Sequence, residues 1–577
     1  MKLKTDYIVG DIPHSEHPNP QFERDGVKVL NGKWNLKKLN ANGLEVFNGK
    51  ILVPFSPESI NSGVVDDFVL NANETLVYNL IFTLDNNFIK GRTLLHFGAV
   101  DSECEVILNG ESVGSHVGGF TPFTLDVTSN IKTGENNLIV KCTDEATRNG
   151  GARGKQNDKR GGIWYTAQSG IWQTVWLETM PSNYIPNVKI LPLSDLKSVK
   201  ISTVTPCNNV KITVFDGENA IITTTFDNEV VLNYNFIPWS PENPKLYNFT
   251  LENAFGDKVN SYFGVRTFTK VYDEKGKLRL ALNGKPYFMN GLLDQGYWSD
   301  GLLTHPSDEA IITELETIKK MGFNTLRKHI KLEPMRWYYH CDRLGIIVWQ
   351  DFVNGGDEYK FTNVALWPFL GFNHKDTDYK YFGRTDKRAR EEFETSVEET
   401  ISVLYNVVSL GVWVVFNEGW GQFDSKYFTN KVKTLDDSRI IDSVSGWHDQ
   451  GEKETELRSI HNYYLPLTVP KDRRAVVLSE FGGYSLKLEG HVTSMGEFGY
   501  KKFKSKEDLT KAIKVLFLNK IKPLIQKGLS ACIYTQVSDV EDEINGLFTY
   551  DRKVTKIPVD VMAEINNELY EESLKIK

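Results

Sequence analysis

Strand-like runs alternate with amphipathic segments through the second half of the chain, and this alternation constrains the fold most. From about residue 273 onward, short apolar runs are separated by segments with apolar residues at helical spacing. The pattern is typical of β/α units, in which helices cover a parallel sheet. Eight such units predict a closed (β/α)8 TIM barrel, which can bury its own core without a further partner.

The sequence pattern gives residue ranges for the strands and helices of the expected barrel. The eight strands are expected at 287–293, 324–329, 346–352, 412–418, 439–445, 457–464, 475–481 and 530–537. The clearest helices are expected at 308–321, 334–344, 387–407 and 507–528.

The chain before residue 273 has a different pattern of short alternating runs separated by turn residues. Up to about residue 182 this pattern predicts a β-sandwich, with Asn109-Gly110 between apolar runs as a hairpin with positive φ at both positions. The next ninety residues or so suit an immunoglobulin-like sandwich. We therefore predict a multidomain β and α/β protein with domains at 1–182, 183–272 and 273–577.

Composition excludes several kinds of partner. The net charge of −8 argues against nucleic acid, because duplex binding needs a concentrated basic face. The opening residues, MKLKTDYIVG, contain no apolar run of signal-peptide length, and no stretch approaches the ~18 apolar residues of a membrane span. We expect a cytoplasmic protein that acts on a neutral small molecule and binds no membrane; whether it forms homo-oligomers stays open.

The cysteines predict neither a disulfide framework nor a metal site. Five are present, an odd number, and they lie far apart at Cys104, Cys142, Cys207, Cys341 and Cys532. Without paired metal-ligand spacing they are expected to be buried free thiols. No metal and no cofactor is expected.

Two glutamates end otherwise apolar strands of the expected barrel. The fourth strand reads VWVVFNE and ends at Glu418, and the seventh reads AVVLSE and ends at Glu480. Active sites of such barrels lie at the carboxyl ends of the strands, and a buried carboxylate is costly unless something there uses it. Either glutamate alone could be a salt-bridged rim residue. Two carboxylates facing each other across the barrel mouth are the minimum equipment for hydrolysing a glycosidic bond, although the sequence does not give their separation.

These features together resemble glycoside hydrolase family two, which contains β-galactosidases, β-glucuronidases and β-mannosidases. The resemblance implies a jelly-roll sandwich, an immunoglobulin-like sandwich and a catalytic barrel in this order. It extends over almost the whole chain through short motifs: NGKW at 31–34, VPF at 53–55, GIWQ at 170–173, FGVR at 263–266, NGKP at 283–286 and GFN at 322–324.

The resemblance also implies roles for individual residues. Glu418 is expected to be the general acid/base and Glu480 the nucleophile of a retaining enzyme. Asn417 is expected to bind the substrate 2-hydroxyl, and Arg327 to support the nucleophile electrostatically. Tyr463, rather than the adjacent Tyr464, is expected to hydrogen-bond the nucleophile.

Further predictions concern other residues near strand ends. His329 is either a structural histidine with its hydrogen bonds satisfied or a ligand of a sugar hydroxyl. His461 is expected to support the site without touching substrate. Asp294 and Trp298, after the first strand, are expected to line the pocket for the terminal sugar.

The sequence also bears on the substrate. Val348-Trp349-Gln350-Asp351-Phe352 is closer to the β-mannosidase branch, but the extra asparagine associated with that branch is absent before Glu418. No Asn-x-Lys pair for a glucuronate carboxylate follows the acidic run at 541–543, which would repel a uronic acid. A neutral β-hexoside is therefore preferred, with β-galactosidase ahead of β-mannosidase and β-glucuronidase.

Two hypotheses from other classes remain. The chain could be a catalytically silent carbohydrate-binding protein, because a fold alone does not prove chemistry. It could also be a metal-dependent hydrolase on the same barrel, although His329 and His461 give that reading little support.

Overall fold

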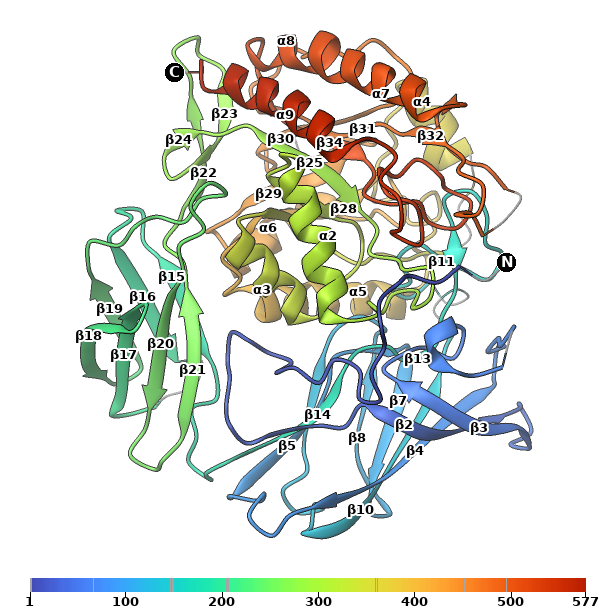
Figure 1. Ribbon diagram of the computed structural model, residues 1–577, viewed down its shortest axis with the longest axis vertical. Coiled ribbons are helices and arrows are strands. Elements are labelled where there is room, and N and C mark those ends of the chain that lie inside the picture. Colours follow the sequence, from blue (N-terminus) through green and yellow to red (C-terminus); the bar gives the residue numbers. More distant parts are fainter. Residues whose placement is uncertain are drawn as a thin grey trace.

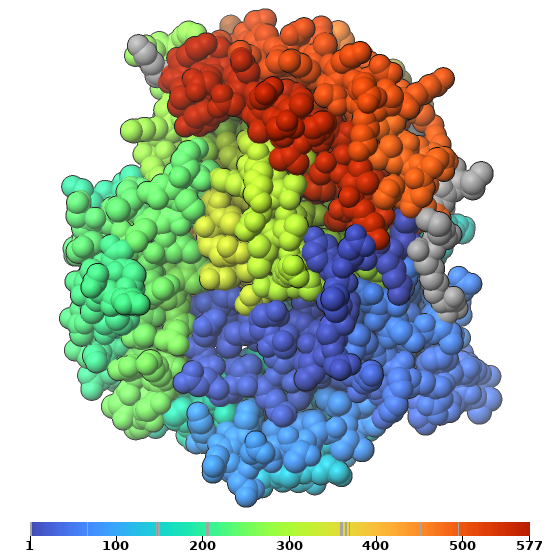
Figure 2. Space-filling model, viewed as in Figure 1, coloured from blue at the N-terminus to red at the C-terminus, as the bar shows by residue number. Residues whose placement is uncertain are grey.

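The computed structural model describes residues 3–65, 67–145, 147, 150–203, 207–357, 360, 362–450, 453–493 and 496–576. Figure 1 shows two β-sandwiches, in blue to cyan and in green, next to a barrel whose helices run from yellow to red. Figure 2 shows the N-terminal segment, in dark blue, lying across the junction between the first sandwich and the barrel. That segment is held to the barrel by hydrogen bonds such as Thr5 Oγ1 to Asp300 Oδ2, 2.8 Å.

The first sandwich packs a six-stranded sheet, ordered β3-β2-β4-β10-β7-β8, near a four-stranded sheet, ordered β1-β14-β5-β9. Its core contains Trp34 and Tyr78, whose rings meet edge to face. The expected hairpin is confirmed: Asn109 and Gly110 both have positive φ between β7 and β8. The elements are β1 Val27–Val29, β2 Gly32–Leu39, β3 Glu45–Val53, η1 Ile60–Ser62, β4 Thr75–Leu84, β5 Arg92–Phe97, β6 Val100–Asp101, β7 Glu103–Leu108, β8 Glu111–Val117, β9 Phe123–Asp126, β10 Gly134–Thr143, β11 Gln156–Asn157, β12 Tyr165–Thr166, β13 Gly170–Ile171 and β14 Val175–Met180.

The second sandwich is smaller and has its own apolar core. A three-stranded sheet, β15-β16-β19, faces a four-stranded sheet, β18-β17-β20-β21, and all pairs are antiparallel. Alternate residues of each strand point into the core, as expected for a sandwich. The strands are β15 Val188–Pro192, β16 Ser198–Thr203, β17 Val210–Asp216, β18 Asn219–Phe226, β19 Glu229–Asn233, β20 Tyr247–Glu252 and β21 Lys258–Phe263.

The remainder of the chain builds the barrel on an eight-stranded sheet, ordered β29-β28-β27-β26-β25-β34-β31-β30, in which all pairs are parallel. A small sheet, β22-β23-β24, packs on its amino-terminal end, where Phe268 and Leu280 share a core with Met289 and Val412. The strands are β22 Phe268–Tyr272, β23 Leu278–Leu282, β24 Lys285–Pro286, β25 Met289–Asp294, β26 Thr325–Lys328, β27 Ile347–Asp351, β28 Leu410–Asn417, β29 Ile440–Ser445, β30 Leu457–Asn462, β31 Ala475–Gly482, β32 Tyr484–Leu486, β33 Lys501–Phe503 and β34 Leu529–Thr535. The predicted fold class, sandwiches followed by a TIM barrel, is confirmed.

Helices cover the outside of the barrel but do not follow every strand. The described parts of the β29–β30 and β30–β31 connections contain no helix, so the expectation of eight complete β/α units was wrong. Pro466 and Pro470 interrupt the second connection, and each removes a backbone donor that a helix needs. The helices are α2 Asp308–Lys320, α3 Met335–Leu344, η2 Thr362–Leu366, α4 Trp367–Phe369, α5 Lys387–Leu404, α6 Ser425–Leu435, α7 Lys506–Lys514, η3 Val515–Ile521, α8 Lys522–Ile525 and α9 Val559–Ser573. Among the described residues, no helix has the length and apolarity needed to cross a membrane.

The pleat of β26 separates two buried cations. Arg327 points into the barrel, whereas Lys328 points to the outer side and contacts Asp294 and Glu333 at 2.5 and 2.7 Å. Asp294 is paired in register with Lys328, and neighbours in a parallel pair share a face of the sheet. The expectation that Asp294 lines the sugar pocket was therefore wrong, because its carboxylate is bound on the other side of the strand.

Trp298 does not line the expected pocket either. It is fully buried, and the Arg552 guanidinium lies 4.3 Å from its ring centroid. The rings of Tyr7 and His305 also pack against it. We therefore correct this expectation as well: Trp298 anchors the loop after β25.

We expect Lys328→Met to lower the free energy of unfolding by about 3–5 kcal/mol, because it leaves the buried Asp294 carboxylate without its cation and Glu333 with Lys331 as its remaining lysine partner. Lys320→Met is the control, since Lys320 makes an exposed pair with Glu316 at 3.6 Å and should change stability by at most about 0.5 kcal/mol. Urea unfolding followed by circular dichroism measures both. Equal stability of the two variants would show that the buried network does not hold the end of β26.

Candidate active site

Glu418 and Glu480 meet at the carboxyl end of the barrel. Glu480 lies near the end of β31, and Glu418 directly follows β28 with a left-handed backbone, φ 50°. Both are buried, with 7 and 4% of their surface exposed. One carboxylate oxygen of each lies within 4.8 Å of the other. The sequence prediction that the two glutamates face each other thus agrees with the geometry.

Arg327 connects the polar residues of the site. Its guanidinium makes a bidentate salt bridge with Asp351, in which Nε donates to Oδ1 and Nη2 donates to Oδ2, both at 2.9 Å. It also donates to Glu480 Oε1 at 3.0 Å and to Asn417 Oδ1 at 2.8 Å. The bond to Oδ1 fixes the orientation of the Asn417 amide. The buried Nδ2 of this amide has no hydrogen-bond partner among the described residues. That donor is free to bind a ligand beside Glu418.

Tyr463 contacts the second oxygen of Glu480. Its hydroxyl donates to Glu480 Oε2, and its ring stacks on Tyr500 at 3.6 Å and 3°. Tyr464, in contrast, is 66% exposed. The structure therefore brings Tyr463, and not its neighbour, to the carboxylate.

The surroundings of Glu480 favour its ionised form. Burial alone would raise the pKa, but the imidazole of His461 and the guanidinium of Arg327 outweigh burial and hold the pKa of Glu480 at about 2. Arg327 keeps its charge for the reciprocal reason: burial opposes that charge, and Asp351 and Glu480 raise its pKa above the ordinary value. A carboxylate held ionised in this way is suited to act as a nucleophile.

His461 lies between the two glutamates. Its side chain is fully buried, with Nδ1 2.6 Å from Glu418 Oε1 and Nε2 2.9 Å from Ser445 Oγ. Its Nε2 is also 3.5 Å from Glu480 Oε1. The ring therefore contacts the two carboxylates directly and is closer to the reaction centre than the sequence suggested.

His329 is also part of this cluster. Its Nδ1 lies 2.7 Å from Asp351 Oδ2, and burial lowers its pKa. The Trp420 ring packs edge-on against it at 6.4 Å. Asp351 orients the ring, so the remaining nitrogen is available for another contact.

Two further buried side chains near the site come from the first sandwich and from the loop after β34, and the second of these stood out in the sequence only as part of the acidic run at 541–543. Lys155, from the first sandwich, is buried, and its Nζ lies 3.9 Å from the centroid of the Trp420 ring. Burial lowers the pKa of Lys155, and Glu543, Glu418 and Glu480 act against this effect. Glu543 follows β34 and accepts a hydrogen bond from Tyr165 at 2.5 Å. Sequence patterns could not find these contacts, because they join loops far apart in the chain.

Glu418, His461 and Glu480 are close enough to hold a metal ion. However, His461 uses its nitrogens for Glu418 and Ser445, and Arg327 already balances the charge of Glu480. The described hydrogen bonds of the cluster are therefore met by the protein itself.

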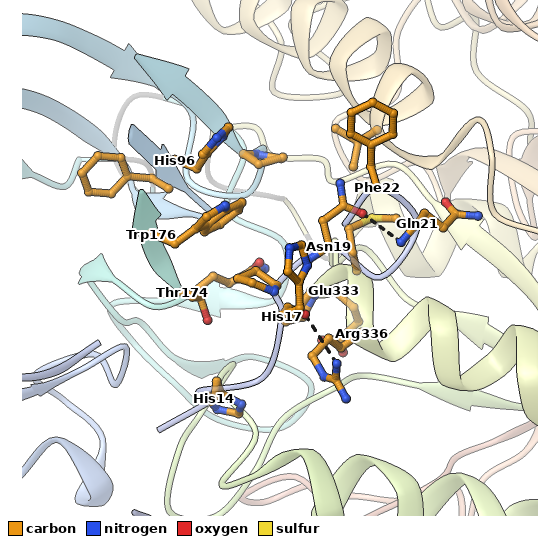
Figure 3. A pocket seen from close by; sticks show the side chains of 18 of the residues that line it. His14, His17, Asn19, Gln21, Phe22, His96, Thr174, Trp176, Glu333 and Arg336 are labelled. Atoms are coloured by element: carbon orange, nitrogen blue, oxygen red, sulfur yellow. Dashed lines mark hydrogen bonds between the residues drawn. The ribbon is translucent and has the colours of Figure 1, made fainter. Parts of the chain in front are cut away.

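A separate cavity of about 400 Å³ lies between the first sandwich and the barrel. Figure 3 shows His17, Trp176, Glu333 and Arg336 around it. Neither Glu418 nor Glu480 lines this cavity. The paired buried carboxylates, rather than the presence of a cavity, therefore locate the candidate site.

Comparisons with known proteins agree with the fold. A model of "Glycosyl hydrolases family 2, sugar binding domain" matches residues 55–181, and one of "Glycosyl hydrolases family 2, TIM barrel domain" matches residues 275–480. A putative beta-glucuronidase of Formosa agariphila is 27% identical over 44% of this chain and 32% of its own length. A beta-galactosidase of Thermoanaerobacter pseudethanolicus is 24% identical over 56% of this chain and 49% of its own length. This chain thus spans a third to a half of the length of these curated relatives.

Solved structures resemble the whole chain. A beta-D-glucuronidase of Dictyoglomus thermophilum superposes with a TM-score of 0.73 at 20% identity, covering 98% of this chain and 99% of the other. A GH2 beta-galacturonidase of Eisenbergiella tayi bound to galacturonate gives 0.70 at 17% identity, covering 95% and 98%. The two family models together match more than half of the 577 residues, in the order sandwich then barrel. The chain therefore belongs to glycosyl hydrolases family 2.

Proposed function

We propose that the protein is a retaining exo-β-glycosidase that removes terminal neutral β-hexosides, with β-galactosides as the first candidates. The observation that carries this proposal is the pair of buried glutamates with oxygens within 4.8 Å, one of which is held ionised by Arg327. Retaining enzymes keep their carboxyl groups ~5–5.5 Å apart, whereas inverting enzymes leave a wider gap for water. The close spacing supports retention.

In the first step Glu480 attacks the anomeric carbon while Glu418 protonates the departing oxygen. Tyr463 and Arg327 hold the two oxygens of Glu480 in place. The free Nδ2 of Asn417 is placed to donate to the sugar 2-hydroxyl, a contact that strengthens in such transition states. The product of this step is a covalent glycosyl-enzyme and a free alcohol.

In the second step Glu418 acts as a base. It removes a proton from water, which attacks the anomeric carbon and releases Glu480. His461, 2.6 Å from Glu418, stabilises the changing charge on this carboxyl group. Two inversions at one carbon return the β configuration.

The charges around the pocket bear on the sugar. The carboxylate of Glu543 would repel an acidic sugar, and this supports a neutral hexose. Lys155 has the opposite effect, since a buried ammonium could bind a sugar carboxylate, and it makes a uronidase the second candidate. A panel of p-nitrophenyl β-glycosides that includes galactoside, mannoside and glucuronide decides between them: a preference for the glucuronide would overturn the neutral assignment.

Replacing each glutamate should separate the two roles. Glu480→Ala removes the attacking group, so the hydrolysis of every substrate should be lost to the same extent. Glu418→Ala should keep the first step for activated aryl glycosides. On a disaccharide, whose leaving group needs a proton, its kcat/KM should fall by about 10²–10⁴-fold. Azide should accelerate Glu418→Ala and yield a β-glycosyl azide, because an anion needs no general base.

Product analysis by NMR gives the configuration of the azide. Formation of an α-glycosyl azide by Glu480→Ala, with no gain for Glu418→Ala, would exchange the two roles. Complete inactivity of the unmodified protein on every glycoside, with sugar binding intact, would instead favour a silent binding protein.

Arg327 should set the acid side of the pH dependence. Because the guanidinium lowers the pKa of Glu480, Arg327→Met should raise that pKa and move the acid limb of kcat/KM upward by about one to three pH units. Arg327→Lys keeps the positive charge and is the matched control, so its acid limb should move less even if its rate falls. Identical acid limbs in both variants and the wild type would refute this electrostatic role.

A further inference from the structure

A groove of about 670 Å³ lies between β32, β33 and the α7–η3 helix. We call it the lysine groove. Its lining includes five lysines, Lys501, Lys502, Lys504, Lys511 and Lys520, and one acidic residue, Asp508. In Figure 1 α7 and β32 lie at the upper right, next to β31, which carries Glu480. None of the residues of the candidate active site lines this groove.

The positive charge of this region is unusual for the chain. Residues 501–527 contain nine lysines and two acidic residues, whereas the whole chain has a net charge of −8. Lys502 pairs with Glu497 at 3.4 Å. In the part of the chain that the structure describes, no ion pair is formed by the other four groove lysines. Their charges are left for an external anion.

The floor of the groove is apolar and partly aromatic. The rings of Tyr484 and Phe503 lie 5.4 Å apart, and Lys501 Nζ lies within 5.4 Å of both ring centroids. Leu516 is buried beneath the groove, and Val515 is 49% exposed. Flat rings beside cationic groups offer both a stacking face and charged donors.

The helix along the groove departs from α-helical winding after Lys514. Residues Val515–Ile521 form a π-helix between α7 and α8. The wider π-helical turn, with its i→i+5 hydrogen bonds, brings Lys520 nearer to the side of Val515 than an α-helix of 3.6 residues per turn would. Lys511 and Lys520 thus line one groove, at a kind of helix defect that often occurs at functional sites.

The groove and the candidate active site are neighbours along the chain. Tyr500 stacks on Tyr463, the tyrosine that bonds Glu480, and Lys501 follows Tyr500 directly. Across the pair of short strands, Lys501 is in register with Tyr484. The lysine groove therefore begins one residue along the chain from the Tyr463–Tyr500 pair beside Glu480.

We propose that the lysine groove binds an anionic segment of a glycan, one that carries carboxylate or sulfate groups. The choice of a glycan rests on the proposed function, whereas the choice of an anion rests on the four unpaired lysines. Nucleic acid fits less well, because the acidic remainder of the chain repels a long polyanion that extends beyond the groove.

Binding is measured in the full chain carrying Glu480→Gln, so that no probe is hydrolysed. The probes are oligogalacturonate for carboxylates, dextran sulfate for sulfates, and neutral galacto-oligosaccharide and single-stranded DNA for comparison. We expect one or both acidic glycans to bind more tightly than the neutral one and than DNA, with affinity that falls as salt screens the charges.

A groove variant tests the site. Combined Lys501→Gln, Lys504→Gln, Lys511→Gln and Lys520→Gln should weaken binding of the acidic glycan about tenfold or more. The control variant carries Lys197→Gln, Lys285→Gln, Lys514→Gln and Lys527→Gln, which remove the same charge at exposed positions outside the groove and should change affinity less than about twofold. With Glu480 restored, the groove variant should hydrolyse simple aryl glycosides as the wild type does.

Three results would overturn the inference: no binding of either acidic glycan at low salt, equal losses in the groove and control variants, or DNA binding as tight as that of the glycans. The proposed function fails separately, if no glycoside is hydrolysed. Groove-dependent binding without hydrolysis would retain the anion site and reject the enzyme.

Discussion

The buried guanidinium of Arg327 is the interaction on which the candidate site depends. A cation with no exposure to solvent must be balanced inside the protein, and Asp351 and Glu480 do this from β27 and β31. The same group bonds Asn417, at the end of β28. One charge on β26 thus joins the ends of four strands. Its hydrogen bonds fix the orientation of the Asp351 and Glu480 carboxylates.

The barrel is least regular where His461 lies. No ladder of hydrogen bonds joins β29 to β30 among the described residues, and these strands end the order of the sheet. Side chains bridge this seam instead: Ser445 Oγ is 3.3 Å from Ser459 Oγ and 2.9 Å from His461 Nε2. Gly446 is needed here, since a Cβ would lie 2.7 Å from the His461 ring. The seam therefore makes room for the imidazole that contacts both glutamates.

Much of the site followed from local pattern. Glu418 and Glu480 stood out because each ends an apolar strand, and their nearness follows from the barrel. The prediction that Asp294 lines the sugar pocket was wrong for an equally local reason. Asp294 follows Leu293, the register partner of Arg327, so the pleat of the strand turns its side chain to the outer face. The prediction of eight complete β/α units was wrong because the described parts of the β29–β30 and β30–β31 connections contain no helix, and Pro466 and Pro470 interrupt the second of them.

The sequence by itself determined the fold class, the strands of the barrel and the two glutamates, because burial imposes a period and polar exceptions to it are visible along the chain. Only the tertiary structure decided which of these residues meet. Lys155 reaches Trp420 from another domain, and Tyr165 bonds Glu543 across 378 positions. Such contacts depend on how the first sandwich packs over the barrel mouth, and no local repeat in either segment records that packing.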